Sequence, residues 1–107
     1  MISAALAPRA RRDLLAAVRW IAADNPAAAR ALRDAVAKAA QRIGDHPHSG
    51  STRPELADAP YRPMLLTGFP YILVYNADRN PPLIVRILHG ARDLPDVLRD
   101  LHASETP

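Results

Sequence analysis

Two segments in the second half of the chain are apolar on both of the faces that a β-strand would present. Tyr71–Tyr75 reads Tyr-Ile-Leu-Val-Tyr, and Leu83–Leu88 reads Leu-Ile-Val-Arg-Ile-Leu. A solvated antiparallel sheet alternates apolar and polar residues, so a sheet built from these strands needs cover on both sides. Strict alternation predicts that Tyr71, Leu73 and Tyr75 oppose Ile72 and Val74, and that Leu83, Val85 and Ile87 oppose Ile84, Arg86 and Leu88.

The first half of the chain supplies cover for one face in the form of two amphipathic helices. Apolar residues recur at helical spacing at Ala10, Leu14, Ala17, Val18 and Ile21, and again at Ala29, Leu32, Val36, Ala39, Ala40 and Ile43. Asn25 is a favourable N-cap, Pro26 suits a first helical turn, and Gly44 is expected to end the second helix. The link between them is short, so we predict an antiparallel helical hairpin over residues 8–44, with Asp13 facing water.

The remaining chain predicts one α+β domain over residues 1–107. Residues 45–60 form a proline-rich loop, and residues 61–89 form a sheet. The strands are expected at Tyr61–Leu66, Tyr71–Tyr75 and Leu83–Leu88, and their short links imply an antiparallel meander. Ile2–Leu6 is expected to be an edge strand. The C-terminal segment, residues 90–107, is predicted to hold a short helix from Pro95 to Leu101.

The elements predicted from the sequence are too few to cover the second face of this sheet completely. The hairpin can cover one face, and the short C-terminal helix can cover only part of the other. An apolar patch left open on a small domain indicates a surface for a partner. The alternatives are that the C-terminal helix closes this face completely, or that the chain forms a dimer.

Composition limits the classes of function. The 107 residues contain no cysteine, which excludes disulfide scaffolds and thiolate metal sites, and they hold no apolar run of membrane-spanning length. We therefore expect a cytoplasmic protein with no membrane contact. Thirteen of the 14 basic residues are arginine, and the net charge of +3 suits an acidic partner. The Asp45-His46-Pro47-His48 run is a weak metal motif because the proline splays the two rings, so neither a metal nor another cofactor is expected.

One cluster could carry chemistry on phosphate. His89 follows the last strand, close to Arg86 and Arg92, and Arg62 could join it. A histidine can act as a general acid while arginines hold a scissile phosphate, which would make a metal-independent ribonuclease site. The favoured alternative is structural: the arginines pair with carboxylates such as Asp58, Asp93 and Asp96, and alternation places Arg86 and His89 on opposite faces.

The order of the motifs resembles the RelE/ParE superfamily of toxins from type II toxin–antitoxin systems, on the ParE-like side. The resemblance runs from about Ile2 to Leu101. It rests on Leu6-Ala7-Pro8-Arg9-Ala10, Arg12-Asp13-Leu14, Trp20-Ile21, Asn25-Pro26-Ala27-Ala28, His46-Pro47, Ser49-Gly50, Tyr61-Arg62, Gly68 with Tyr71-Ile72-Leu73-Val74-Tyr75, and Ile87-Leu88-His89-Gly90-Ala91-Arg92-Asp93. It implies the fold predicted above, a strand, a helical hairpin and a small sheet.

The resemblance also implies a function. A ParE-like toxin inhibits DNA gyrase without being an enzyme, and a ParD-like antitoxin neutralises it and supplies the contact with DNA. The alternatives are a ribosome-dependent mRNA endoribonuclease of the RelE type, using His89, Arg86, Arg92 and Arg62, and a non-toxic interaction module. The position of Trp20 beside Ile21, near the end of the first helix, favours a core or hairpin-packing residue, with an exposed recognition role as the alternative. The resemblance to toxins that bind an antitoxin adds Trp20 to the expected partner-binding set: Arg9, Arg12, Trp20, Tyr71, Leu73, Tyr75, Arg86 and Leu98.

Overall fold

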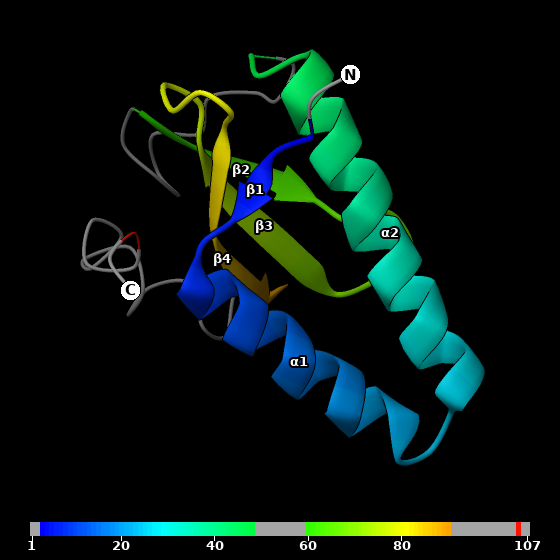
Figure 1. The fold of residues 1–107 in the computed structure, drawn as a ribbon. Helices are drawn as coiled ribbons and strands as arrows, with labels where there is room; N and C mark the ends of the chain where they lie inside the picture. Colours follow the sequence, from blue (N-terminus) through cyan, green and yellow to red (C-terminus); the bar gives the residue numbers. More distant parts are fainter. Residues whose placement is uncertain (1–2, 49–59, 91–104, 106–107) are drawn as a thin grey trace.

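The computed structural model describes residues 3–48, 60–90 and 105, and it shows two helices packed on one side of a four-stranded sheet (Figure 1). In chain order the elements are β1 (Ala5–Leu6), α1 (Pro8–Ala22), α2 (Pro26–Asp45), β2 (Tyr61–Leu65), β3 (Tyr71–Asn76) and β4 (Leu83–His89). The strand order is β1-β4-β3-β2, with β1 parallel to β4 and the other pairs antiparallel. The predicted α+β fold is confirmed as far as β4, and the expected helix from Pro95 to Leu101 lies outside the described residues.

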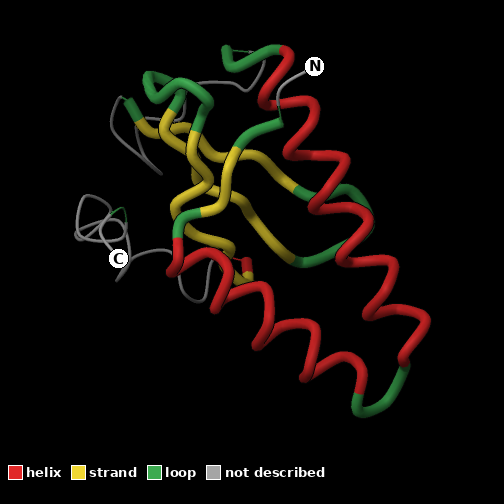
Figure 2. Tube along the Cα trace, viewed as in Figure 1, coloured by secondary structure: helices red, strands yellow, loops and turns green. Residues whose placement is uncertain are grey.

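The helical hairpin forms where the sequence predicts it, with a three-residue link between α1 and α2 (Figure 2). The Oδ1 of Asn25 accepts a hydrogen bond from the Ala28 N–H at 3.1 Å, which confirms the N-cap. Gly44 does not end α2, because the helix continues to Asp45 and His46 is its C-cap. No described helix combines the length and the apolar character that crossing a membrane would require.

The face of the sheet beneath the hairpin holds the larger part of the core. Leu32, Val36 and Ile43 of α2 are almost completely buried, as the predicted apolar face requires. From the sheet, Leu73 and Tyr75 of β3 join this cluster, and both side chains are 0 % exposed. Alternation along β3 is therefore confirmed.

A β-bulge breaks the alternation along β4. Tyr75 pairs with Ile84 while its neighbour Val74 pairs with Arg86, so Val85 has no partner of its own. The extra residue places Ile84 and Ile87 together in the helix-side cluster, while Val85 and Leu88 join the opposite one. The strict alternation predicted for this strand is wrong, because a bulge shifts the orientation of every side chain after it.

The second face of the sheet is closed within the single chain. Tyr61, Ile72, Val74, Val85 and Leu88 form its apolar cluster, and none of them is more than 7 % exposed. The expectation of an open apolar surface on this face is wrong.

Glu105 contacts polar side chains at the margin of this face. Its carboxylate accepts hydrogen bonds from the Tyr61 hydroxyl, from Nδ2 of Asn76 at 3.1 Å and from Nη1 of Arg79 at 3.2 Å. One carboxylate thus joins β2, the end of β3 and the turn that follows it.

The carboxylate of Asp13, on α1, contacts the outer edge of β4 beyond the point where β1 ends. The two residues of β1 pair only with Leu83 and Ile84, so the rest of β4 needs another partner for its outer edge. The Oδ2 of Asp13 accepts the Ile87 N–H at 3.0 Å and the Arg86 Nε at 2.7 Å, and Oδ1 accepts Arg86 Nη2 at 3.1 Å. The expectation that Asp13 faces water is wrong, because it anchors α1 to β4.

Replacing Asp13 with alanine should lower the free energy of unfolding by about 3 kcal/mol, because it leaves the largely buried Arg86 guanidinium and the Ile87 N–H without their acceptor. Chemical denaturation followed by circular dichroism measures the change. Asp34, an exposed aspartate of α2, provides the control, and Asp34→Ala should change stability by less than about 0.5 kcal/mol. Equal losses in the two variants would contradict the role given to Asp13.

Tyr61 should ionise at a higher pH than an ordinary tyrosine. Burial raises the pKa of Tyr61 far above its usual value, and the hydrogen bond to the Glu105 carboxylate raises it further. The unfolded chain loses this proton near pH 10, so the stabilisation is complete below about pH 10 and is lost as the pH rises above it. In an alkaline titration of tyrosinate absorbance, Tyr61→Phe should match the parent up to about pH 10.5, whereas Glu105→Gln should ionise earlier than the parent.

Candidate partner-binding groove

An open groove of about 580 Å³ lies between α1 and the outer end of β4. It exists because β1 stops after two residues and α1, held by Asp13, takes its place beside β4. The lining residues are Asp13, Ala16, Ala17, Trp20 and Ile21 from α1, Pro70 and Tyr71 from the start of β3, and Arg86, Ile87, Leu88 and His89 from β4.

Trp20 is the most exposed large apolar side chain in the described part of the chain. It is 81 % exposed on the helical stripe that also carries Asp13 and Ala16, at intervals of three and four residues. The prediction that Trp20 packs in the core or within the hairpin is wrong, and the alternative of an exposed position is confirmed. A tryptophan presented beside a groove offers a partner a large apolar surface and an indole N–H donor.

The sheet side of the groove combines an aromatic pair with a neutralised arginine. The rings of Tyr71 and His89 meet edge to face, with centroids 5.4 Å apart and planes at 88°. Arg86 makes a two-point contact with Asp13, and the two side chains are 12 % and 14 % exposed, so the pair contributes little net charge. The centre of the groove therefore carries little net charge.

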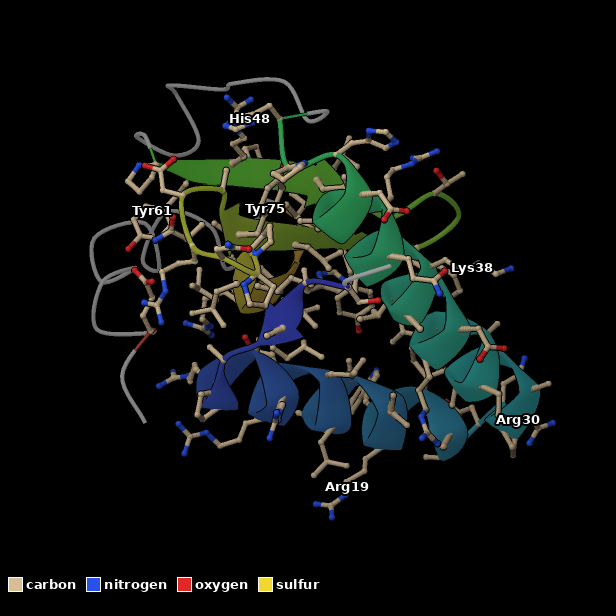
Figure 3. The ribbon with its side chains drawn as sticks, turned by 45° about the horizontal axis from the view of Figure 1, so that its top comes forward. Arg19, Arg30, Lys38, His48, Tyr61 and Tyr75 are labelled. Carbon is tan, nitrogen blue, oxygen red and sulfur yellow. The ribbon has the colours of Figure 1, made fainter. Side chains whose placement is uncertain are left out.

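Positive charge lies along α1 outside the groove. Arg9 and Arg12 are exposed on the first turns of the helix, and Arg19 points into solvent from its last turn (Figure 3). Arg9 precedes Asp13 by four residues, so it lies on the same side of the helix as the groove. A groove with little net charge, an exposed tryptophan and cations at its border suits a segment that is apolar at its centre and acidic at its ends.

The structure separates the residues that the sequence assigned to partner binding. Trp20, Tyr71 and Arg86 line the groove, and Arg9 and Arg12 extend from the same helix. Leu73 and Tyr75 are buried beneath the hairpin, and the Tyr75 hydroxyl donates a hydrogen bond to the Pro47 carbonyl at 2.9 Å. Neither residue therefore presents surface to a partner in this conformation. Leu98 lies outside the described residues.

The proposed ribonuclease residues are only partly brought together. Arg86 and His89 line the same groove, although their pairing with Val74 and Tyr71 assigns them to opposite faces of the sheet. Arg62 lies on β2, at the other edge of the sheet. Arg92, like the carboxylates Asp58, Asp93 and Asp96, lies outside the described residues.

Sequence reasoning missed Asp13 as the partner of Arg86. The signal was present, because Asp13 falls between Ala10 and Ala17 at intervals of three and four residues, on the margin of the buried stripe. A carboxylate at such a position must find a donor or remain at the surface. The sequence could not show which donor, since Arg86 is 73 residues away.

Two comparisons with known proteins bear on the family and the fold of this chain. A family model described as the ParE toxin of the type II toxin–antitoxin system, parDE, matches residues 5–94. The chain also resembles a solved structure titled "Chromosomal ParDE TA system from P. aeruginosa", with a TM-score of 0.68 and 22 % identity over 84 % of this chain and 97 % of that one, which shows a shared fold. No curated protein matches the chain in sequence. Because the family model spans most of its length, the chain belongs to the ParE toxin family of type II toxin–antitoxin systems.

Proposed function

We propose that this ParE-family chain stops bacterial growth by inhibiting DNA gyrase in the cytoplasm, and that a ParD-like antitoxin neutralises it. The chain acts by binding gyrase rather than as an enzyme, and DNA contact is made by the antitoxin. Membership of the ParE family supports the proposal. So does the α1–β4 groove, which presents the exposed Trp20 to a partner and in which Arg86, the one arginine among its described lining residues, is already paired with Asp13.

The observation that favours binding over RNA cleavage is the ion pair between Arg86 and Asp13. A metal-independent ribonuclease needs cations that are free to hold the scissile phosphate and its developing charge. The arginine next to His89 in the groove already has its Nε and Nη2 occupied by a carboxylate at 2.7 and 3.1 Å. Arg62 lies at the opposite edge of the sheet, so among the described residues no unpaired arginine shares the groove with His89.

The antitoxin is assigned to the α1–β4 groove because of its chemistry. Trp20 supplies an exposed aromatic anchor, and Arg9 and Arg12 supply flanking cations. The whole chain is basic, with an isoelectric point near 10.0, so an acidic antitoxin segment is attracted to it before contact. An amphipathic helix or an extended segment with alternating apolar residues would fit such a groove.

Purified chain in excess over gyrase should abolish ATP-dependent supercoiling of a relaxed plasmid, and added ParD-like antitoxin should restore it. Agarose gel electrophoresis of the plasmid measures both effects. Expression without antitoxin should stop growth and induce the DNA-damage response. Normal supercoiling in excess chain would contradict gyrase inhibition, and harmless expression would favour a non-toxic interaction module.

The same experiment separates the ribonuclease alternative through His89. His89→Ala should retain inhibition of supercoiling, because His89 has no role in chemistry under this proposal and the groove that it lines is assigned to the antitoxin and not to gyrase. If His89→Ala abolished toxicity, and if translated messages were cut in cells expressing the parent chain, the RelE-type activity would replace the gyrase proposal.

Trp20→Ala should weaken binding of the ParD-like antitoxin at least about tenfold while leaving the fold intact, because buried aromatic anchors dominate interface energies. Isothermal titration calorimetry measures the affinity. Leu15→Ala is the matched control, since Leu15 is a 48 % exposed apolar residue of the same helix that does not line the groove. Equal affinities for Trp20→Ala and Leu15→Ala would remove the antitoxin from this groove.

A further inference from the structure

Three hydrogen-bond donors meet at one place on the sheet face opposite the hairpin. Tyr61 and Asn76 are paired directly across β2 and β3, and Arg79 follows in the turn after β3. None of the three lines the α1–β4 groove. Tyr61 lies far from Arg19 and Arg30 of the hairpin (Figure 3). This cluster is therefore separate from the surface assigned to the antitoxin.

The fold itself holds two of these donors in place. The Oδ1 of Asn76 accepts the Asp78 N–H at 3.0 Å, which turns the Nδ2 of the same amide toward the Tyr61 hydroxyl and Arg79. The Tyr61 ring is 4 % exposed within the apolar cluster of this face. Burial raises the pKa of Tyr61 far above its usual value, so the hydroxyl keeps its proton and remains a donor. Neither orientation depends only on the group that the donors bind.

The carboxylate of Glu105 shows which chemistry these donors suit. Its Oε2 accepts the Tyr61 hydroxyl, and its Oε1 accepts Asn76 Nδ2 at 3.1 Å and Arg79 Nη1 at 3.2 Å. Both oxygens of one planar group are thus bound, and the guanidinium supplies the opposite charge. An ionised carboxylate is an acceptor without a proton to donate, which is what three donors require.

The Glu105 side chain is held in a way that permits exchange. The Arg79 side chain is 56 % exposed, so one side of the cluster opens to solvent, and the Glu105 side chain itself is 11 % exposed. Another carboxylate arriving from that side would replace each hydrogen bond with an equal one. The advantage of Glu105 is then its attachment to the chain, which gives it a high effective concentration at the cluster.

We infer that Tyr61, Asn76 and Arg79 form a binding site for a small carboxylate anion, and that Glu105 occupies this site as an intramolecular, exchangeable ligand. The inference stands on the contacts of this cluster. It does not depend on gyrase inhibition or on the antitoxin occupying the α1–β4 groove.

The test uses Glu105→Ala, which removes one methylene and the carboxylate, together the size of acetate. Acetate at neutral pH should shift the side-chain amide signal of Asn76 in the ¹⁵N-labelled variant toward its position in the parent chain. It should also raise the melting temperature by at least about 4 °C relative to chloride at equal ionic strength. Acetamide has the same shape without the charge and should do neither. An acetate effect no larger than that of chloride or acetamide would overturn the site.

The parent chain tests the exchange. Acetate should shift the Asn76 amide signal there too, but at a half-saturating concentration at least about tenfold higher, because it must displace a tethered carboxylate. Equal values in the parent and in Glu105→Ala would show that Glu105 does not occupy the site. A parent that does not respond to any acetate concentration would show a fixed contact and would overturn the exchange. If Glu105→Ala fails to fold, Glu105→Gln keeps the side-chain shape without the charge, and acetate should displace its amide more readily than it displaces Glu105.

Two further variants locate the bound acetate. Arg79→Gln in the Glu105→Ala background should weaken acetate binding by roughly tenfold or more, because the guanidinium supplies the charge-assisted bond. Arg30→Gln in the same background makes the same change in net charge at an exposed position of α2, where salt screens its effect, and it should weaken binding by less than about twofold. Equal losses in the two variants would show that acetate responds only to overall charge, and the site would then be wrong.

Discussion

The contact on which the arrangement of this molecule depends is the carboxylate of Asp13 against the outer edge of β4. β1 pairs with only the first two residues of β4, so a helix side chain has to satisfy the backbone beyond it. Asp13 does this while pairing with Arg86 at 2.7 Å, so a single side chain joins the hairpin to the sheet and neutralises a largely buried charge. Charge-assisted bonds of this geometry are stronger than neutral ones, and they fix orientation as well as distance.

This anchor decides where the surface available to a partner lies. Because α1 follows the edge of β4, its outer stripe and the strand enclose the groove in which Trp20 is exposed. The turn joining the helices projects beyond the sheet, so the helices cover one face of the sheet while each keeps a second side open (Figure 1).

The apolar residues on the opposite face of the sheet stabilise the fold and are not exposed to a partner. This apolar cluster is buried, and the Glu105 carboxylate accepts hydrogen bonds from Tyr61, Asn76 and Arg79 beside it. Strands that are apolar on both faces can therefore be covered by a partner or by the same chain. The alternation of residues along the strand does not distinguish between the two. In this ParE-family chain, exposed apolar side chains and cations occur together beside the helices. That is where its surface suits a partner.

The sequence by itself determined the elements of this protein and their order. Helical spacing and the Asn25-Pro26 signal gave the hairpin, and the β-formers of Tyr71–Tyr75 gave the central strand, because these signals act within one or two turns of chain. The motif series also led to the ParE family. Only the tertiary structure decided that Val85 is a bulge, that Asp13 meets Arg86, and that Trp20 is exposed while Tyr75 is buried. Each of these depends on residues distant in sequence meeting at one place, and local periodicity carries no information about such encounters.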